Sequence, residues 1–323
     1  MASQSFSFSH NQLTELTSIA LAQQIKHQDI LTPLSEAAIA TAYVHHATQV
    51  YGTTPAHQKI NPVHPPMLLL HGFDSSVFEF RRLLPLLAQQ DLWAQDIWAI
   101  DLLGFGFTAR SLQFPITPLT IKTHLYCVWK TLIAQPVVLI GASMGGAAAL
   151  DFALSYPEAV KQLVLIDSAG FSVGLPMGRL IVQPLGNWAT AFLRSLKVRQ
   201  SISLKAYYDP SLASADALLC ATLHLAQPNW QQALISFTQS GGYRSFKARL
   251  REIQMPTLIL WGEDDRILGT KDAKQFHQAI PHSHLIWIPQ CGHVPHLEQP
   301  QLTAAHILEF IQRVYPASLS SAG

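Results

Sequence analysis

The stretch Gly141-Ala142-Ser143-Met144-Gly145 has the residue types of a nucleophile elbow, Gly-x-Ser-x-Gly. A short apolar run precedes it, and very small side chains follow it. This pattern predicts a strand, a sharp turn with the serine at its tip, and a helix. Gly141 and Gly145 suit such a turn, because a residue without a Cβ tolerates strained backbone and close neighbours. Ser143 is therefore the candidate nucleophile.

A serine hydroxyl is a weak nucleophile, so it needs a base that takes its proton and a third group that orients the base. Two stretches downstream supply such groups. Residues 258–267 contain the acidic run Glu263-Asp264-Asp265, and residues 289–300 contain Gly292-His293. His293 is the candidate general base. The chain order of serine, acid and histidine is that of one known triad lineage.

An oxyanion formed when the serine attacks a carbonyl needs backbone N–H donors. Met144, the residue after the candidate nucleophile, is the first expected donor. His71-Gly72-Phe73 follows an early apolar run. We expect the second donor, the N–H of Phe73, to come from this loop.

Continuous short apolar runs separated by helical patterns predict buried parallel strands covered by helices on both faces. The expected strands span residues 67–73, 97–101, 137–141, 163–167, 257–261 and 285–289, with a further strand favoured over 38–46. The expected helices span residues 77–90, 119–134, 144–155, 270–280 and 300–314, and Pro-rich residues 47–66 are expected to form a loop.

Three regions of different character follow. Residues 1–37 are expected to form an N-terminal extension with an amphipathic helix over 11–29. Residues 38–170 and 253–323 form the α/β core. Residues 171–252 have helical patterns but no core strand, and a gap of that length predicts an inserted helical lid. This segment has nine Lys and Arg against three acidic residues, which indicates a solvated basic face or attraction to anionic substrates or membrane surfaces.

Five motifs together resemble the α/β-hydrolase fold superfamily. They are HGF (71–73), DLLGFG (101–106), GASMGG (141–146), WGEDDRI (261–267) and CGHVPHLE (291–298). The resemblance implies an eight-stranded, mostly parallel sheet with a helical lid after the sixth strand. Seven strands are visible in the sequence, so the first is missing or lies before residue 38. LKAYYDP and ALISFTQSGGY in the lid resemble lidded esterase-like and carbon–carbon bond hydrolases.

The resemblance also bears on the acid. It favours Asp265, three residues after Gly262, while the adjacent Asp264 remains open. Some relatives carry the acid at the end of the sixth strand, where this chain has Asp167. Asp101 is expected to anchor the glycine turn that follows it.

The resemblance assigns two further features. His71 is expected to brace the oxyanion loop, with Gly72 as a structural residue. Epoxide hydrolases and haloalkane dehalogenases have an aspartate where this chain has Ser143, so the serine argues against both chemistries.

The expected activity is that of a cofactor-independent serine hydrolase that cleaves a carboxylic ester of a medium-sized, largely apolar substrate through an acyl-enzyme. The same triad would serve a carbon–carbon bond hydrolase, an acyltransferase or a perhydrolase. A third alternative is a non-catalytic module that binds a ligand or a protein. Such modules usually lack a triad residue, whereas all the required residue types are present here.

Composition limits the remaining possibilities. With 49% hydrophobic and 13% charged residues and a net charge of +1, the chain is typical of a globular protein, and nothing indicates nucleic-acid binding. Cys127, Cys220 and Cys291 lack a C-x-x-C spacing, which favours a reducing compartment. We therefore expect a cytoplasmic protein, with only a faint resemblance of its N-terminus to a transit peptide.

Neither a membrane span nor a metal or cofactor is expected. No apolar run approaches the length of about 18 residues that a spanning helix requires. The pairs His282-x-His284 and His293-x-x-His296 lack the acidic or cysteine partners of a metal site. Peripheral membrane contact through the basic lid stays open, and the sequence does not predict the oligomeric state.

Overall fold

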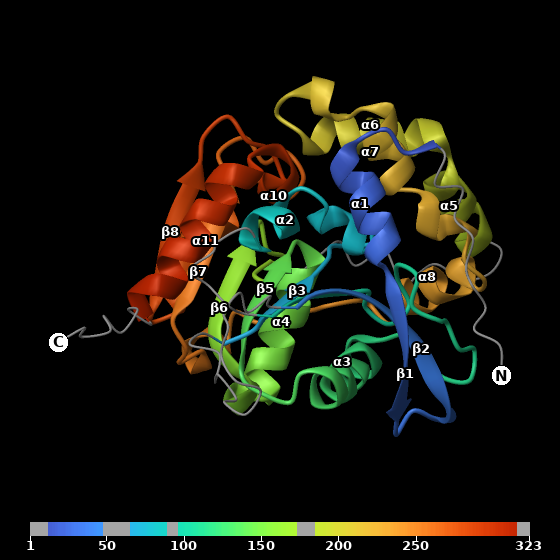
Figure 1. Cartoon of the computed structure of the whole chain (residues 1–323), viewed down its shortest axis with the longest axis horizontal. Coiled ribbons are helices and arrows are strands. Elements are labelled where there is room, and N and C mark those ends of the chain that lie inside the picture. The colour runs from blue at the N-terminus through green and yellow to red at the C-terminus, as the bar shows by residue number, and fades with distance from the viewer. Residues whose placement is uncertain (1–11, 48–64, 89–95, 173–184, 315–323) are drawn as a thin grey trace, which may run out of the picture.

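The protein is represented by a computed structural model that describes residues 12–47, 65–88, 96–172 and 185–314. Within these residues, eight strands form one sheet in the order β1-β2-β4-β3-β5-β6-β7-β8 (Figure 1). The strands are β1 (Lys26–Thr32), β2 (Ser35–His46), β3 (Met67–Leu70), β4 (Ile97–Ile100), β5 (Val137–Ala142), β6 (Val160–Ile166), β7 (Thr257–Gly262) and β8 (Ser283–Ile288). β2 pairs antiparallel with β1 and β4, and the other neighbours are parallel. The mostly parallel sheet expected from the sequence is confirmed.

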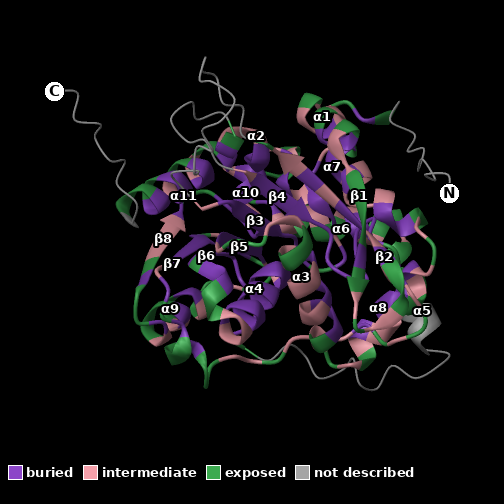
Figure 2. Cartoon of the chain, turned by 60° about the horizontal axis from the view of Figure 1, so that its bottom comes forward, coloured by how far each residue is buried: buried purple, intermediate pink, exposed green. Residues whose placement is uncertain are grey.

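Helices cover both faces of this sheet, and the central strands are buried between them (Figure 2). One face packs against α3 (Pro118–Leu132), α4 (Met144–Ser155) and α9 (Lys271–Ala279). The other packs against α1 (Leu16–Gln24), α2 (Leu83–Ala88) and α11 (Pro300–Val314). The remaining short elements of the core are α10 (Pro295–Glu298) and the 3₁₀ turns η2 (Val77–Phe80) and η3 (Pro157–Ala159).

The two apolar layers explain why the central strands are apolar throughout. In β3, Met67 and Leu69 belong to the core on one face, whereas Leu68 and Leu70 belong to the core on the other. Successive side chains of a strand point to opposite faces, so a strand covered on both sides needs an apolar residue at every position.

The first strand corrects the sequence prediction for the N-terminus. The helix expected over residues 11–29 ends at Gln24, and residues 26–32 form β1 instead. Only Ile30 is buried in this strand, so its sequence has no apolar alternation to reveal it. Its pairing with β2, in which Ile30 lies opposite Ile39, defines it. Residues assigned to the N-terminal extension thus supply the edge of the sheet. The loop expected over 47–66 lies almost wholly outside the described residues.

In the described part of the segment between β6 and β7 there are four helices and no strand. They are α5 (Leu185–Arg194), α6 (Leu196–Ala206), α7 (Ala215–Cys220) and α8 (Trp230–Gln239), with the 3₁₀ turns η5 (Pro210–Leu212), η6 (Leu223–Ala226) and η7 (Leu250–Glu252). We call α5 to α8, with η5 and η6, the inserted helices. They lie together at one side of the sheet, beside α1 (Figure 1).

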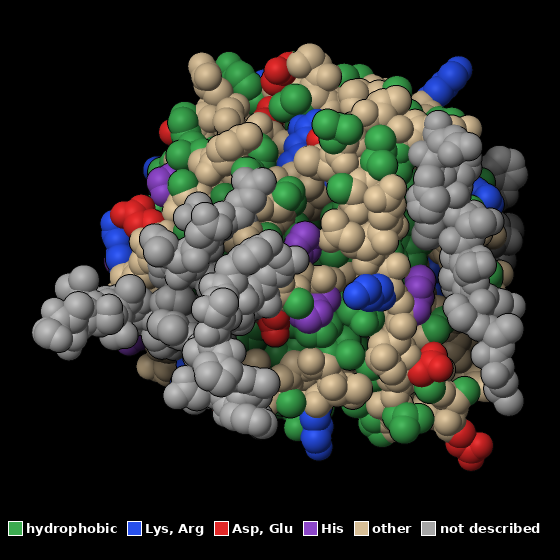
Figure 3. Space-filling view, in the orientation of Figure 1, with side chains coloured by type: hydrophobic (Ala, Val, Ile, Leu, Met, Phe, Trp, Pro, Cys, Tyr) green, Lys and Arg blue, Asp and Glu red, His purple; other side chains and the backbone are tan. Residues whose placement is uncertain are grey.

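The surface gives two further observations. On the face drawn in Figure 3, the Lys and Arg side chains lie apart from one another and form no continuous basic patch. Among the described residues, no helix combines the length and the apolar character that crossing a membrane requires.

Candidate active site

Ser143 lies at the sharp turn between β5 and α4, with φ 52° and ψ −119°. This conformation is rarely adopted by residues other than glycine, so the surrounding structure must enforce it. The flanking glycines allow the close packing that does so. A Cβ on Gly145 would overlap the carbonyl oxygen of Leu70, and a Cβ on Gly141 would overlap the carbonyl oxygen of Gly145.

His293, between β8 and α10, lies between the candidate nucleophile and an acid. Its Nε2 is 2.9 Å from Oγ of Ser143, and its Nδ1 is 2.9 Å from Oδ2 of Asp265. An ionised carboxylate only accepts hydrogen bonds, so Nδ1 carries the proton. Nε2 of the neutral ring is then free to accept the proton of Ser143. This is the arrangement that a serine–histidine–acid mechanism requires.

Asp265 is held as a carboxylate. Its Oδ1 accepts hydrogen bonds from the backbone N–H groups of Ile267 and Leu268, at 2.7 and 3.0 Å. Burial alone would raise the pKa of Asp265, but the hydrogen bond from His293 and these backbone donors lower it below its usual value. Asp264, the neighbouring candidate, is half-buried, and its backbone N–H donates to the carbonyl of Cys291.

Asp167, the other candidate acid, lies behind Asp265 at the end of β6. Its Oδ1 accepts the N–H of Gly262 at 3.1 Å. Burial and the charge of Asp265 raise the pKa of Asp167 well above its usual value, which favours the protonated form of this carboxyl. Ligand atoms of Asp167, Asp265 and His293 lie within 4.8 Å of one another, a grouping that could hold a metal ion. The hydrogen bond between Asp265 and His293 accounts for this clustering without one.

The loop of residues 71–76, which we call the oxyanion loop, passes directly beside the serine. A Cβ on Gly72 would lie 3.3 Å from Cβ of Ser143. Met144 is the first residue of α4, so its N–H has no acceptor within the helix. The roles of Phe73 and Met144 as oxyanion donors stay predictions, which this proximity supports.

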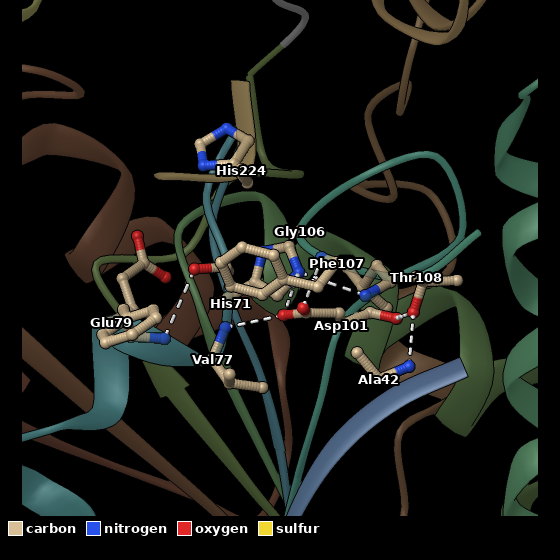
Figure 4. Close-up of polar contacts among 12 residues, drawn as sticks. Ala42, His71, Val77, Glu79, Asp101, Gly106, Phe107, Thr108 and His224 are labelled. Carbon is tan, nitrogen blue, oxygen red and sulfur yellow. Dashed lines mark hydrogen bonds and ion pairs between the residues drawn. The ribbon is translucent and has the colours of Figure 1, made fainter. Parts of the chain in front are cut away.

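A network of buried polar side chains holds the oxyanion loop and the backbone next to it in place (Figure 4). Nε2 of His71 accepts the N–H of Leu102 at 3.1 Å, so Nδ1 is the donor to the carbonyl of Gly72, at 2.8 Å. Burial lowers the pKa of His71 to about 4, so the ring is neutral. Asp101 accepts the backbone N–H groups of Val77 and Phe107, both at 2.6 Å. Both side chains therefore hold backbone rather than contact His293.

Sequence reasoning missed Glu79, a half-buried residue of η2 beside the site. The N–H of Gly72 donates to its Oε2 at 2.5 Å, so Glu79 holds the start of the oxyanion loop. Burial raises the pKa of Glu79 to about 7, against the effect of this hydrogen bond. The only signal in the sequence is a lone acid within the apolar run Val77-Phe78-Glu79-Phe80.

The other histidines of the candidate metal patterns lie apart. His282 and His284 are exposed at the start of β8. His296 is buried, neither ring nitrogen makes a hydrogen bond, and burial lowers its pKa to about 3. None of these three belongs to a close group of three ligands among the described residues.

Ser143 and His293 line a pocket. The oxyanion loop and the inserted helices form much of its wall. Many of the side chains that line it are apolar, among them Phe78, Ile202, Ala206, Ala221, Val294 and Leu297. The reactive groups thus face a space suited to an apolar ligand.

A family model described as the alpha/beta hydrolase fold matches residues 65–300. The chain belongs to the α/β-hydrolase fold family. This α/β-hydrolase is 34% identical, over 76% of its own length and 72% of the relative, to the alpha/beta hydrolase domain-containing protein VTE7 of Arabidopsis thaliana. It is 26% identical to Lipase 1 of Psychrobacter immobilis, over 76% of each chain. It is 29% identical to 2-hydroxy-6-oxo-2,4-heptadienoate hydrolase of Pseudomonas putida, over 72% of its own length and 84% of the relative.

Proposed function

We propose that this protein is a serine hydrolase that cleaves a carboxylic ester of a medium-sized, largely apolar substrate through an acyl-enzyme. The observation that carries the proposal is the continuous hydrogen-bonded chain from Asp265 through His293 to Ser143, at 2.9 Å for each contact of the ring. The relatives of the same family include a lipase.

In this mechanism His293 takes the proton of Ser143 as the hydroxyl attacks the ester carbonyl. Asp265 holds the imidazole in the required tautomer and stabilises the imidazolium. The N–H groups of Phe73 and Met144 donate to the oxyanion. His293 then protonates the leaving alcohol, and a water activated by the same ring releases the acyl group. No metal or cofactor takes part in these steps.

The nature of the substrate rests on the pocket and the relatives. The apolar lining supports an acyl or alcohol group of low polarity. The Pseudomonas putida relative is named as a hydrolase of 2-hydroxy-6-oxo-2,4-heptadienoate, the enol form of a vinylogous diketone, which makes such a diketone the second candidate substrate. An acyltransferase or perhydrolase would use the same residues. A non-catalytic binding module would have no need of the hydrogen-bonded chain.

The test is hydrolysis of p-nitrophenyl esters of increasing chain length and of a vinylogous diketone, by wild-type protein and by Ser143→Ala. We expect the esters to be the better substrates and the variant to lose nearly all activity, because a triad removal leaves only about one part in 10⁶ of kcat. Retention of most activity by Ser143→Ala would contradict the assignment of the nucleophile. Faster turnover of the diketone would favour the second candidate substrate.

We also propose that the inserted helices act as the lid of this site and that the protein works in the cytoplasm. Support for the lid comes from the pocket, which Ile202 and Ala206 of α6 and Ala217 and Cys220 of α7 help to line. Burial raises the pKa of the Cys220 thiol to about 11, so it stays protonated as a structural residue.

A further inference from the structure

Asp74, the residue after Phe73 in the oxyanion loop, has a buried carboxylate. Side chains from three elements of the inserted helices form hydrogen bonds with it. Nη2 of Arg199, in α6, donates to its Oδ2. Nε2 of His224, in η6, lies 3.2 Å from its Oδ1. Nε1 of Trp230, in α8, donates to the same oxygen at 2.8 Å. One side chain of the core therefore receives hydrogen bonds from three separate parts of the inserted segment.

The charges in this cluster balance. Burial favours the neutral acid, but the hydrogen bonds from His224 and Trp230 and the charge of Arg199 hold the pKa of Asp74 well below its usual range. Burial lowers the pKa of His224, and its Nε2 is the donor because an ionised carboxylate only accepts hydrogen bonds. Nε of Arg199 also donates to the carbonyl of Leu193 at 2.7 Å, which fixes the guanidinium in place.

The contacts of this cluster hold the backbone of the oxyanion loop at Phe73 and Asp74. Asp74 has φ 48°, in the left-handed region, so its position depends on contacts that enforce it. The preceding ring, Phe73, packs against Phe237 of α8 with centroids 6.0 Å apart. Helix α8 thus contacts two consecutive residues of the oxyanion loop, Phe73 through Phe237 and Asp74 through Trp230.

We infer that Asp74 is a positioning residue, through which the docked inserted helices hold the N–H of Phe73 where it can donate to the oxyanion. This inference rests on the proposed function. It means that the oxyanion site is complete only while α6, η6 and α8 are docked on the core. The helices above the pocket would then contribute to the chemical step as well as to substrate binding.

A second buried aspartate provides a matched control. Asp216 of α7 is as buried as Asp74, each being 5% exposed. It accepts hydrogen bonds from the backbone of Thr14 at 2.6 Å and from Oγ of Ser18 at 2.6 Å. It therefore also joins the inserted helices to the rest of the protein, but it does not contact the oxyanion loop. Asp216→Asn should weaken the attachment of the inserted helices to the rest of the protein without a direct effect on the oxyanion loop.

The experiment compares wild type, Asp74→Asn and Asp216→Asn for kcat, KM and Tm with one p-nitrophenyl ester. It also measures Ki for a trifluoromethyl ketone, whose adduct with serine places an oxyanion in the same site. Asparagine tolerates the left-handed conformation, so Asp74→Asn removes the charge without new backbone strain. Removal of one oxyanion donor costs about 10²- to 10³-fold in kcat, and we expect a displaced donor to cost about 10- to 100-fold.

For Asp74→Asn we expect this loss in kcat with KM within about threefold, and a rise in Ki by a similar factor to the loss in kcat/KM. For Asp216→Asn we expect a lower Tm but kcat and Ki within about twofold of wild type. If Asp74→Asn is folded and matches Asp216→Asn in kcat and Ki, Asp74 is only structural and the inference is overturned.

Two further outcomes separate the possible failures. If Asp74→Asn does not fold, Trp230→Phe removes one donor to Asp74 while it retains most of the ring packing. A loss of about fivefold in kcat would support the inference, and an unchanged kcat and Ki would overturn it. If wild-type hydrolysis does not depend on Ser143, the proposed function itself is wrong. A Ser143-dependent enzyme that is indifferent to Asp74 would contradict the positioning role alone.

Discussion

Two buried aspartates lie side by side behind His293, and the structure gives them different tasks. At Asp265 the hydrogen bond from Nδ1 of His293 outweighs burial and lowers the pKa, whereas burial and the charge of Asp265 raise the pKa of Asp167. The sequence left the choice between them open because both follow apolar strands. This difference in pKa depends on contacts between β6 and β7, which no local pattern encodes.

Substitution of each aspartate by asparagine should separate these tasks. Asp265→Asn favours the wrong tautomer of His293, so we expect kcat for ester hydrolysis to fall by about 10⁴-fold. Asp167→Asn keeps a neutral, hydrogen-bonding side chain of similar shape, so we expect a loss below about tenfold. The measurement is kcat with one p-nitrophenyl ester. A larger loss for Asp167→Asn than for Asp265→Asn would reverse the assignment of the acid.

Glu79 should make stability depend on pH. Burial raises its pKa in the folded protein to about 7, from a usual value of 4.5. The folded state therefore retains a proton that the unfolded chain loses, so stability falls as pH rises between these two values. At about 1.4 kcal/mol for each pKa unit, the loss is about 3 kcal/mol.

Glu79→Gln removes the titratable carboxyl and retains an oxygen that can accept the N–H of Gly72. We expect urea unfolding between pH 4.5 and 7.5 to show a flatter pH dependence for this variant than for wild type. Glu158→Gln changes the net charge equally at an exposed position and should leave the wild-type slope. Parallel curves for wild type and Glu79→Gln would show that Glu79 titrates alike in the folded and unfolded states.

At the scale of the element, the strand–turn–helix unit of β5 and α4 requires glycines, because neighbouring backbone atoms pack directly against Gly141 and Gly145.

Most of the strands and helices could be predicted because apolar runs buried on two faces leave a clear pattern. β1 could not, because it is an edge strand with one buried residue, Ile30, and is defined by its pairing with β2. The pattern of apolar residues in a sequence indicates which strands are buried, but it does not indicate an exposed strand that pairs at the edge of the sheet.

Gly145→Ala should be strongly destabilising, because the added Cβ would overlap the carbonyl oxygen of Leu70. We expect a loss of about 3 kcal/mol or more in the free energy of unfolding, measured in urea, or failure to fold. Gly269→Ala is the control. Its Cβ would meet nothing within 4 Å, although φ is +74°. The strain at that position should cost only about 1 kcal/mol. Equal effects of the two substitutions would show that contact with β3 is not the reason for the glycine.

At the scale of the whole molecule, the inserted helices contact both loops that present the reactive groups. Asp74 receives hydrogen bonds from partners 125, 150 and 156 positions away in the chain. The backbone N–H of His293 donates to the carbonyl of Ala206, at the end of α6. The motifs singled out these candidate groups because each lies within three residues of a glycine near the end of a strand. The contacts that position them could not be predicted, because they join distant segments whose residues have no common spacing.

Exposed apolar side chains on α5 and α6 bear on the peripheral membrane contact that the sequence leaves open. Phe192 and Leu196 are 64% and 60% exposed, and Arg194 and Lys197 lie beside them in the chain and are also exposed. We expect the protein to sediment with phosphatidylglycerol vesicles more than with phosphatidylcholine vesicles, and less so at high salt. Phe192→Ser with Leu196→Ser should reduce this binding. Leu112→Ser, which removes a side chain that is 64% exposed elsewhere, should not. Equal loss in both variants would contradict a surface on α5 and α6.

The central claim is that Ser143 is a nucleophile activated by His293, and covalent labelling tests it most directly. Folded wild-type protein is treated with a fluorophosphonate probe, and the modified residue is located by mass spectrometry of its peptides. We expect a single adduct on Ser143, and labelling slowed by at least about 10³-fold in His293→Ala, because the neutral hydroxyl is a weak nucleophile without its base. Absence of an adduct on Ser143, or labelling at the same rate without His293, would contradict the account.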